Sequence, residues 1–327
     1  MNIPFETLKK EFKRVLLKLS LIEEKAELCA HTFAANSRDG VYSHGLNRFP
    51  SFVNTIIEKQ VDILAEPAFI ERNGLIEIWD GNFGIGIHNA TLAMNRAIEL
   101  AKANGIGLVA MRHTNHWIRG GTYGWQAADA GCIGICFTNT MANMPPWGGK
   151  EPRLGNNPLI ISVPREDGHI VLDMAMTQFS YGKLQDTDLK GLELPEFGGY
   201  DANGNLTKNP SAIIQSRRAL PIGFWKGSGL SFMLDILLTA ITGGRSTAAI
   251  NSIVRESGVS QFFLCLHQSN MHQDLIEEII RYTKSGSPAE PGGEILYPGE
   301  NTLRKRRESE LHGIPVNEKI WNEVLKM

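Results

Sequence analysis

The 327-residue sequence predicts a mixed α/β protein with a helical cap at its N-terminus. Through the first sixty or so residues, apolar side chains recur at steps of three and four, as they do on amphipathic helices. From about residue 68 onward, helical patterns alternate with short apolar runs that are typical of strands. Because the sequence has no internal repeat and no linker, we expect one compact unit.

The predicted cap consists of three helices. Apolar residues within 5–19 share one helical face, and no positively charged segment precedes an apolar block, so a signal peptide is not indicated. A second helical pattern covers residues 22–36. Pro50 is placed to open a third helix at its first turn. The segment 37–45 between the last two helices is polar and flanked by glycine.

Strands and helices alternate in the rest of the chain. Asn104-Gly105 and Gly131 end two of the helices, and Asn203-Gly204 marks a turn. The charged stretch 301–310 is typical of an exposed helix face. Strands are expected at 75–79, 106–111, 132–138, 160–163, 170–173 and 261–267, and helices at 90–103, 122–130, 228–242 and 274–284.

Composition excludes several classes of function. Lysine and arginine total 33 and aspartate and glutamate total 35, so the net charge of −2 provides no basic surface for nucleic acid or an anionic membrane. The most apolar stretch, 230–241, is shorter than the ~20 residues that cross a bilayer. The four cysteines form no CxxC pair, and Cys132 and Cys136 fit a buried strand as free thiols. We therefore expect a cytoplasmic protein without nucleic-acid or membrane partners.

The usual dinucleotide-binding fingerprint does not occur in its required context. Residues 105–110 match the letters G-x-G-x-x-A, but a helix precedes them and a strand follows, whereas a Rossmann loop follows a strand and opens a helix. Residues 84–89 have the right context but lack the third glycine and an acidic residue about 20 positions later. A dinucleotide would have to be bound in another way.

His44 and Arg48 form the first candidate site. If the local backbone is helical, both side chains lie on one face, and the guanidinium lowers the pKa of the imidazole. Arginine can hold a substrate carboxylate through two hydrogen bonds while histidine moves a proton. The residue types alone leave open an ordinary pair of surface polar groups.

His113 and His116 have a spacing that could serve a metal ion. No HExxH frame surrounds them, and no nearby carboxylate supplies a third ligand. A metal-dependent hydrolase or isomerase that uses these histidines is therefore a remote alternative, and we expect no metal site.

Polar loops follow several expected strands, where open α/β sheets bind ligands. Residues 115–121, 138–149 and 155–158 are such loops. Residues 224–229 add an aromatic ring, a cation and small residues before a helix, which suits an anionic aromatic ligand. The simpler interpretation of this last segment is a packed tryptophan beside a lysine chain.

These motifs together resemble the malate/L-lactate dehydrogenase family, whose members are NAD(P)-dependent oxidoreductases without a Rossmann fold. The resemblance covers essentially the whole chain. The segments that carry it are 40–48, 115–121, 146–149, 155–158, 172–175, 181–183 and 297–300.

The resemblance implies a non-Rossmann NAD(P)-binding fold with a mixed, largely antiparallel sheet, in a homodimer with its sites near the subunit interface. It implies hydride transfer from NADH, with NADPH left open, to the 2-keto group of a small anionic sugar acid. Other 2-keto or 2-hydroxy acids (malate, lactate, sulfolactate, ureidoglycolate or a cyclic imino acid) and a non-catalytic sugar-acid sensor are the alternatives. We expect a cap over residues 1–66, a binding core over 67–285, and a segment 286–327 that returns to the cap.

The resemblance also assigns His44 as the expected proton donor. Arg48 and His116 are hypothetical contacts for the carboxylate and oxygens of the substrate. Asp173 is a further hypothetical site residue, which would orient the nicotinamide or a proton-relay partner. Close relatives have Gly-His-Glu where this chain has Gly299-Glu300-Asn301, which is a departure from the family pattern. The expected cofactor contacts are His169, Ile170, Val171, Leu172, Asp173, Met174, Ala175, Trp225, Lys226, Gly299, Glu300 and Asn301.

Overall fold

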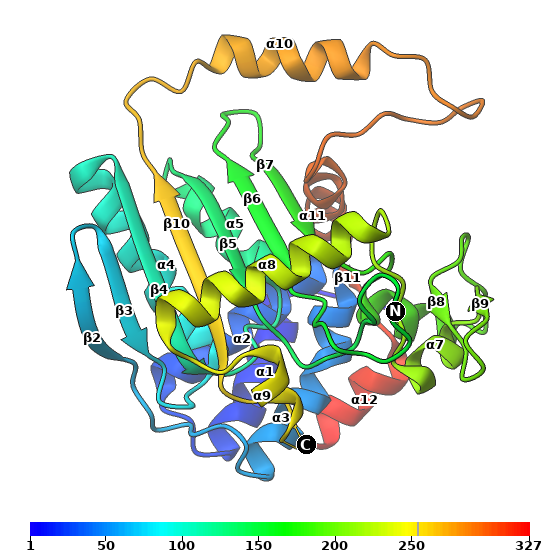
Figure 1. The fold of residues 1–327 in the computed structure, drawn as a ribbon, viewed down its shortest axis with the longest axis horizontal. Coiled ribbons are helices and arrows are strands. Elements are labelled where there is room, and N and C mark those ends of the chain that lie inside the picture. Colours follow the sequence, from blue (N-terminus) through cyan, green and yellow to red (C-terminus); the bar gives the residue numbers. More distant parts are fainter. Residues whose placement is uncertain (254) are drawn as a thin grey trace.

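The computed structural model describes residues 1–253 and 255–327. A seven-stranded sheet lies at the centre, in the order β2-β3-β4-β10-β5-β6-β7 (Figure 1). β3 and β4 run parallel, and the other neighbouring strands of this sheet are antiparallel. The predicted mixed, largely antiparallel sheet is therefore confirmed. The strands are β2 (Ala68–Asn73), β3 (Ile76–Asp80), β4 (Ile106–Thr114), β5 (Ile133–Thr138), β6 (Leu159–Val163), β7 (Ile170–Met174) and β10 (Val259–Leu266).

Helices cover both faces of the sheet. α4 (Gly86–Asn104) and α5 (Gly120–Asp129) lie against one face, and α8 (Trp225–Thr242) crosses the other (Figure 1). Successive side chains of β10 point to opposite faces of the sheet. Phe263 packs in the core under α4 and α5, whereas Phe262 packs against α8.

The N-terminal helices form a second layer with its own apolar core. Phe12, Phe33 and Phe49 pack ring against ring at its centre, and Trp321 near the C-terminus joins the same cluster. Both ends of the chain therefore meet in this cap, while the division of the chain at residues 66 and 285 stays a prediction. The elements of the cap are β1 (Asn2–Ile3), α1 (Phe5–Lys18), α2 (Glu23–Arg38), α3 (Phe49–Ile57), α11 (Glu300–His312), β11 (Ile314–Pro315) and α12 (Glu318–Lys326).

Several short helices escaped prediction. α6, α7 and α9 begin at Ser180, Asn209 and Ser246, whose side chains accept hydrogen bonds from the first turn. Such helices start from a local cap rather than from a long apolar pattern, so periodicity does not reveal them. The remaining elements are η1 (Tyr42–His44), η2 (Leu46–Arg48), α6 (Tyr181–Leu189), β8 (Gly199–Tyr200), β9 (Leu206–Thr207), α7 (Pro210–Ser216), α9 (Thr247–Asn251) and α10 (Gln273–Lys284).

The four cysteines are buried and carry free thiols, as the sequence predicts. None of the helices in the described ranges combines the length and apolar character that crossing a bilayer requires.

Candidate active site

A cavity of about 660 Å³ lies between the cap and the sheet. His44, Arg48, His116 and Asp173, which the sequence singles out, all line it. Further polar lining comes from η1, from the loop between β5 and β6, from α6 and from the segment before β10. The residues concerned are Ser43, Thr140, Asn143, Asn156, Tyr181, Gln185 and Glu256.

A close approach of backbone segments fixes His44 in this cavity. A side chain at Gly45 would place its Cβ 2.2 Å from Ser37 Oγ on α2, so only glycine fits there. Asn36 Nδ2 donates a hydrogen bond to the His44 carbonyl at 2.9 Å, and Ser43 Oγ lies 3.1 Å from His44 Nδ1. The imidazole is therefore held by α2 and by its own neighbour.

Burial sets the resting charge of His44. Mainly because the ring is removed from water, and further because Arg48 and Arg119 lie nearby, the pKa of His44 falls to about 4, although Asp173 acts in the opposite direction. His44 is therefore neutral near pH 7 in the absence of substrate. An anionic substrate adds negative charge beside the ring and raises the pKa of His44.

His116 is a different kind of histidine. Its ring stacks with that of His44, with centroids 6.5 Å apart, and burial together with Arg48 keeps its pKa well below the ordinary value. Ile118 N donates to His116 Nδ1 at 3.0 Å, so the neutral ring carries its proton on Nε2. A protonated His116 would lose that hydrogen bond. Ser43, in contrast, can donate to or accept from His44 Nδ1, so His44 keeps its partner in both charge states.

Arg48 supplies a cation to the cavity. Across the part of the chain that the structure describes, its guanidinium has no hydrogen-bond or ion-pair partner. A planar guanidinium in this state is suited to a carboxylate through two parallel hydrogen bonds.

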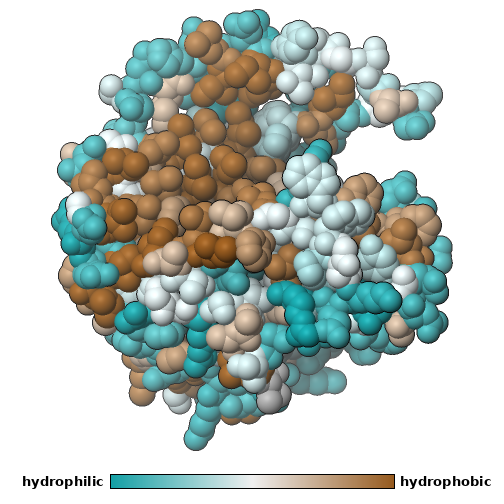
Figure 2. All heavy atoms as spheres, viewed as in Figure 1, coloured by the Kyte–Doolittle hydropathy of each residue, from teal (hydrophilic) through white to brown (hydrophobic). Residues whose placement is uncertain are grey.

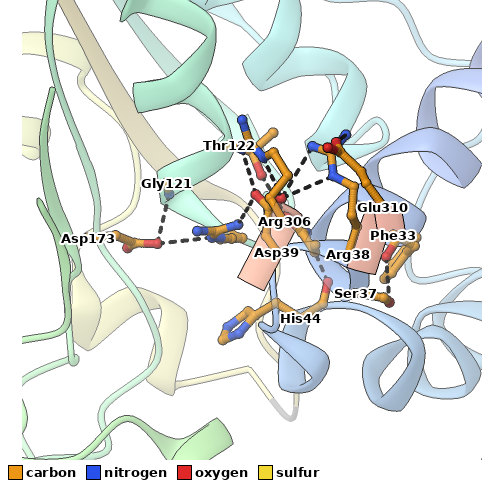
Figure 3. A network of polar contacts seen from close by, with 12 residues as sticks. Phe33, Ser37, Arg38, Asp39, His44, Gly121, Thr122, Asp173, Arg306 and Glu310 are labelled. Atoms are coloured by element: carbon orange, nitrogen blue, oxygen red, sulfur yellow. Dashed lines mark hydrogen bonds and ion pairs between the residues drawn. The ribbon is translucent and has the colours of Figure 1, made fainter. Parts of the chain in front are cut away.

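Buried charges connect Asp173 to the cap (Figure 3). Asp173 Oδ2 accepts hydrogen bonds from Gly121 N at 3.0 Å and from Arg119 Nε at 3.4 Å. Arg119 also donates to Asp39 at 3.1 Å, and Asp39 accepts two hydrogen bonds of 2.9 Å from Arg306 on α11. The orientation of the Asp173 carboxylate therefore depends on Asp39, which directly follows α2, and on Arg306 of α11.

The whole chain is similar to known proteins. A family model described as malate/L-lactate dehydrogenase matches residues 3–325. This chain belongs to the malate/L-lactate dehydrogenase family. Within the family, a protein of Citrobacter koseri named 2,3-diketo-L-gulonate reductase is 44% identical over 330 residues, with 99% of each chain covered. A protein of the same name from Escherichia coli O127:H6 is 43% identical with the same coverage.

Solved structures of dehydrogenases share the fold. Sulfolactate dehydrogenase from Methanocaldococcus jannaschii is 29% identical with a TM-score of 0.87, and the match covers 99% of this chain and 95% of that one. Malate dehydrogenase from Entamoeba histolytica has a TM-score of 0.94 over 100% of this chain and 96% of that one, and at 24% identity it shows the fold alone. Family membership makes this chain an oxidoreductase and indicates a nicotinamide cofactor.

The wall formed by β7 fits such a cofactor. β7 is the last strand of the sheet, so its outer backbone edge pairs with no strand of the described residues. The segment before α11 runs beside it, with Val171 N donating to Pro298 O at 3.0 Å. Gly299 has φ 94°, and a Cβ there would lie 3.0 Å from Val171 N, so the approach requires glycine. Peptide groups at a sheet edge can hydrogen-bond the carboxamide of a nicotinamide. The predicted cofactor residues that line the cavity are Val171, Leu172, Asp173, Ala175 and Gly299.

Two predicted cofactor residues have structural partners instead. His169 Nε2 lies 2.9 Å from Asp129 Oδ1, and its Nδ1 accepts from Arg165 N at 3.1 Å. Glu300 forms an ion pair with Lys284 and accepts from the backbone N–H of Tyr297 at 3.1 Å. Neither side chain lines the cavity, so their role as cofactor contacts stays a prediction. Also outside the lining are Ile170, Met174, Trp225, Lys226 and Asn301.

The two histidines of the metal alternative have separate environments. His113 Nδ1 lies 2.8 Å from Asp80 Oδ2, and its ring stacks on Phe83 outside the cavity that His116 lines. Within residues 1–253 and 255–327, no group of three or more His, Cys, Asp or Glu residues is arranged to hold a metal ion. The geometry does not favour the hydrolase alternative.

Several cavity residues were not predicted individually. Arg119, Thr140 and Asn143 lie in loops that the sequence marks as polar, so their region was predicted but not their part in the cavity. No motif surrounds Glu256 in the sequence, and only the fold brings it to the cavity that His44 lines.

Proposed function

We propose that this chain reduces the 2-keto group of 2,3-diketo-L-gulonate with NADH and forms 3-keto-L-gulonate. One observation carries the proposal: His44 can change its protonation state without losing its hydrogen bond to Ser43, and it shares a cavity with the Arg48 cation, which has no partner among the described residues. The names of the relatives that are 43–44% identical over the full length support the substrate.

The residues of the cavity have complementary roles in this proposal. Arg48 binds the substrate carboxylate, and the Nε2–H of His116 donates to an oxygen of the substrate beside it. His44 transfers its proton to the keto oxygen as negative charge develops there, a general-acid contribution of about 10²–10⁴-fold. The neutral ring that remains keeps its proton on Nδ1, which continues to donate to Ser43 Oγ. Bound NADH supplies the hydride to carbon 2.

A panel of 2-keto acids tests the proposal. Oxidation of NADH and NADPH is followed by nicotinamide absorbance with 2,3-diketo-L-gulonate, pyruvate, oxaloacetate and sulfopyruvate. We expect turnover with the sugar acid and NADH. Failure with every keto acid would contradict the reductase proposal and leave the sensor alternative, and a preference for NADPH would correct the cofactor.

Binding of a keto-acid analogue is expected to take up a proton. Burial holds the pKa of His44 at about 4 before the analogue binds, and the analogue carboxylate raises this pKa. Calorimetry of oxamate binding to the NADH complex at pH 6, in buffers of different ionisation enthalpy, measures the uptake. We expect close to one proton for the wild type and close to none for His44→Asn. Equal uptake in both proteins would assign the proton to another group.

We further propose that the chain forms a homodimer through the exposed face of α8. Phe232, Met233, Ile236 and Leu237 are between 42% and 54% exposed there. Figure 2 shows a broad apolar surface over α8 and the adjoining sheet. Continuous apolar surface of this kind usually marks a protein interface, and a two-fold contact buries it on both copies. Trp225 and Lys226 stand at the N-terminal end of the same helix.

A charge placed on this helix is expected to separate the two copies. Ile236→Asp and Leu237→Asp should change the mass in sedimentation equilibrium from twice 36.2 kDa to 36.2 kDa. Leu311→Asp is the matched control, since Leu311 is 78% exposed on α11. A monomeric wild type, or variants that remain dimeric, would refute this interface.

We also expect a cytoplasmic location. The four buried, unpaired thiols fit a reducing compartment, where disulfides are rare.

A further inference from the structure

Glu256 places a carboxylate in the same cavity as Arg48, the cation that is proposed to bind the substrate. It lies between α9 and β10, and it lines the cavity together with Arg48 and Thr140. Its Oε2 accepts a hydrogen bond from Met141 N at 2.8 Å. No other hydrogen bond to this carboxylate is formed by the described residues. Burial raises the pKa of Glu256, although Met141 N and the charges of Arg48 and Arg217 act against the shift. The neighbouring protein groups therefore do not fully compensate the charged form of Glu256.

Asn143 presents a second acceptor nearby. Its Nδ2 donates to Asn156 Oδ1 at 3.0 Å, and the same oxygen accepts from Thr140 Oγ1 at 3.0 Å. Asn143 Oδ1 is buried and has no hydrogen-bond partner in the described part of the chain. Buried acceptors without a donor are rare in folded proteins. One that lines a ligand cavity can accept a hydrogen bond from a donor on the ligand.

The arrangement selects by donor and acceptor pattern. In the proposed reaction, Arg48 binds the carboxylate of the keto acid and His44 donates a proton to its carbonyl oxygen. Among the other lining groups, Glu256 and Asn143 present acceptor oxygens, which match hydroxyl groups. A second substrate carboxylate placed against these two residues would meet a carboxylate and an amide oxygen, and an apolar tail would leave both acceptors unsatisfied.

We propose that Glu256 and Asn143 form a subsite that accepts hydrogen bonds from the hydroxyl groups of a sugar-acid chain, and that Glu256 disfavours dicarboxylates. The inference rests on the proposed reductase function and adds the residues that determine its substrate class.

The substitution Glu256→Gln tests the subsite, because glutamine keeps an acceptor for Met141 N and removes the charge. The measured quantity is the ratio of kcat/KM for 2,3-diketo-L-gulonate to kcat/KM for oxaloacetate. We expect this ratio to fall about tenfold or more, with pyruvate changed much less. Asn143→Leu should lower kcat/KM for the sugar acid without a gain for oxaloacetate. Glu151→Gln is the matched control, because Glu151 is exposed and pairs only with Arg153 among the described residues.

Two further measurements keep the result interpretable. Thermal unfolding and NADH affinity establish that each variant is folded. If Glu256→Gln fails to fold, Glu256→Asp replaces it. The aspartate retains the negative charge on a side chain that is one methylene shorter. Turnover of the sugar acid should therefore fall, while turnover of oxaloacetate should stay low. An unchanged substrate ratio in a folded Glu256→Gln variant overturns this inference. A wild type that reduces no keto acid overturns the proposed function instead.

Discussion

Replacing His44 by asparagine is expected to lower kcat for keto-acid reduction by about 10²–10⁴-fold, while NADH binds as before. Asparagine fills similar space and can still hydrogen-bond Ser43, but it cannot release a proton to the keto oxygen. The loss should appear in kcat more than in KM, because the proton is transferred in the transition state. Steady-state kinetics with 2,3-diketo-L-gulonate and fluorescence titration with NADH provide the two measurements.

Two other histidines make this experiment specific. His31→Asn is the control, since His31 lies on α2 and does not line the cavity. His116→Asn should raise KM more than it lowers kcat, because His116 acts only as a hydrogen-bond donor in this scheme. If His116→Asn abolishes turnover and His44→Asn does not, the two roles must be exchanged.

Replacing Asp39 by asparagine is expected to lower the free energy of unfolding by about 3–5 kcal/mol. Asp39 is 4% exposed, and it accepts hydrogen bonds from Arg38, Arg119 and Arg306 (Figure 3). Burial acts to raise the pKa of Asp39, but the hydrogen bonds from Arg306 and the charges of Arg119 and Arg38 hold it below its ordinary value. The substitution leaves Arg119, which is 5% exposed, without its main counter-charge.

Urea denaturation at pH 7 measures this loss. Because the pKa of Asp39 is lower in the folded state, its stabilising contribution is present above the unfolded value of 3.8 and is lost as the pH falls through the folded value. The difference between wild type and Asp39→Asn should therefore shrink in acid. Asp129→Asn is the control, since Asp129 pairs with His169 at the surface, where such pairs contribute about 0–1 kcal/mol. Equal free energies of unfolding for Asp39→Asn and wild type would mean that the ion pairs of Asp39 contribute little to stability.

The sequence permits prediction of the long elements and of part of the cavity. α2, α8 and β10 follow from apolar patterns of ten or so residues, which local sequence contains in full. His44 and Arg48 are four positions apart, and the two short helices between Tyr42 and Arg48 keep both side chains on the cavity. The polar loops after β4 and β5 likewise follow from their place at strand ends.

Residues that are distant in sequence set the limit of such predictions. Arg119 and Arg306 reach Asp39 across 80 and 267 positions, and no local pattern marks a buried aspartate that binds two arginines. The placement of Glu256 beside Arg48 has the same origin. His169 and Glu300 show the converse, because a motif located them but their contacts with Asp129 and Lys284 are decided by packing.

The amino-acid sequence by itself determined the mixed α/β class and the pair of residues at the helical junction, because these follow from periodicity and from short spacings. It also contains the motifs that carry the family resemblance. Only the tertiary structure decided which histidine has a partner that tolerates protonation. It also decided which carboxylates face the substrate and which are neutralised in the interior. The physical reason is that folding, and not the order of residues along the chain, sets the neighbours of a buried group. Those neighbours determine its pKa and whether each of its hydrogen-bonding atoms has a partner.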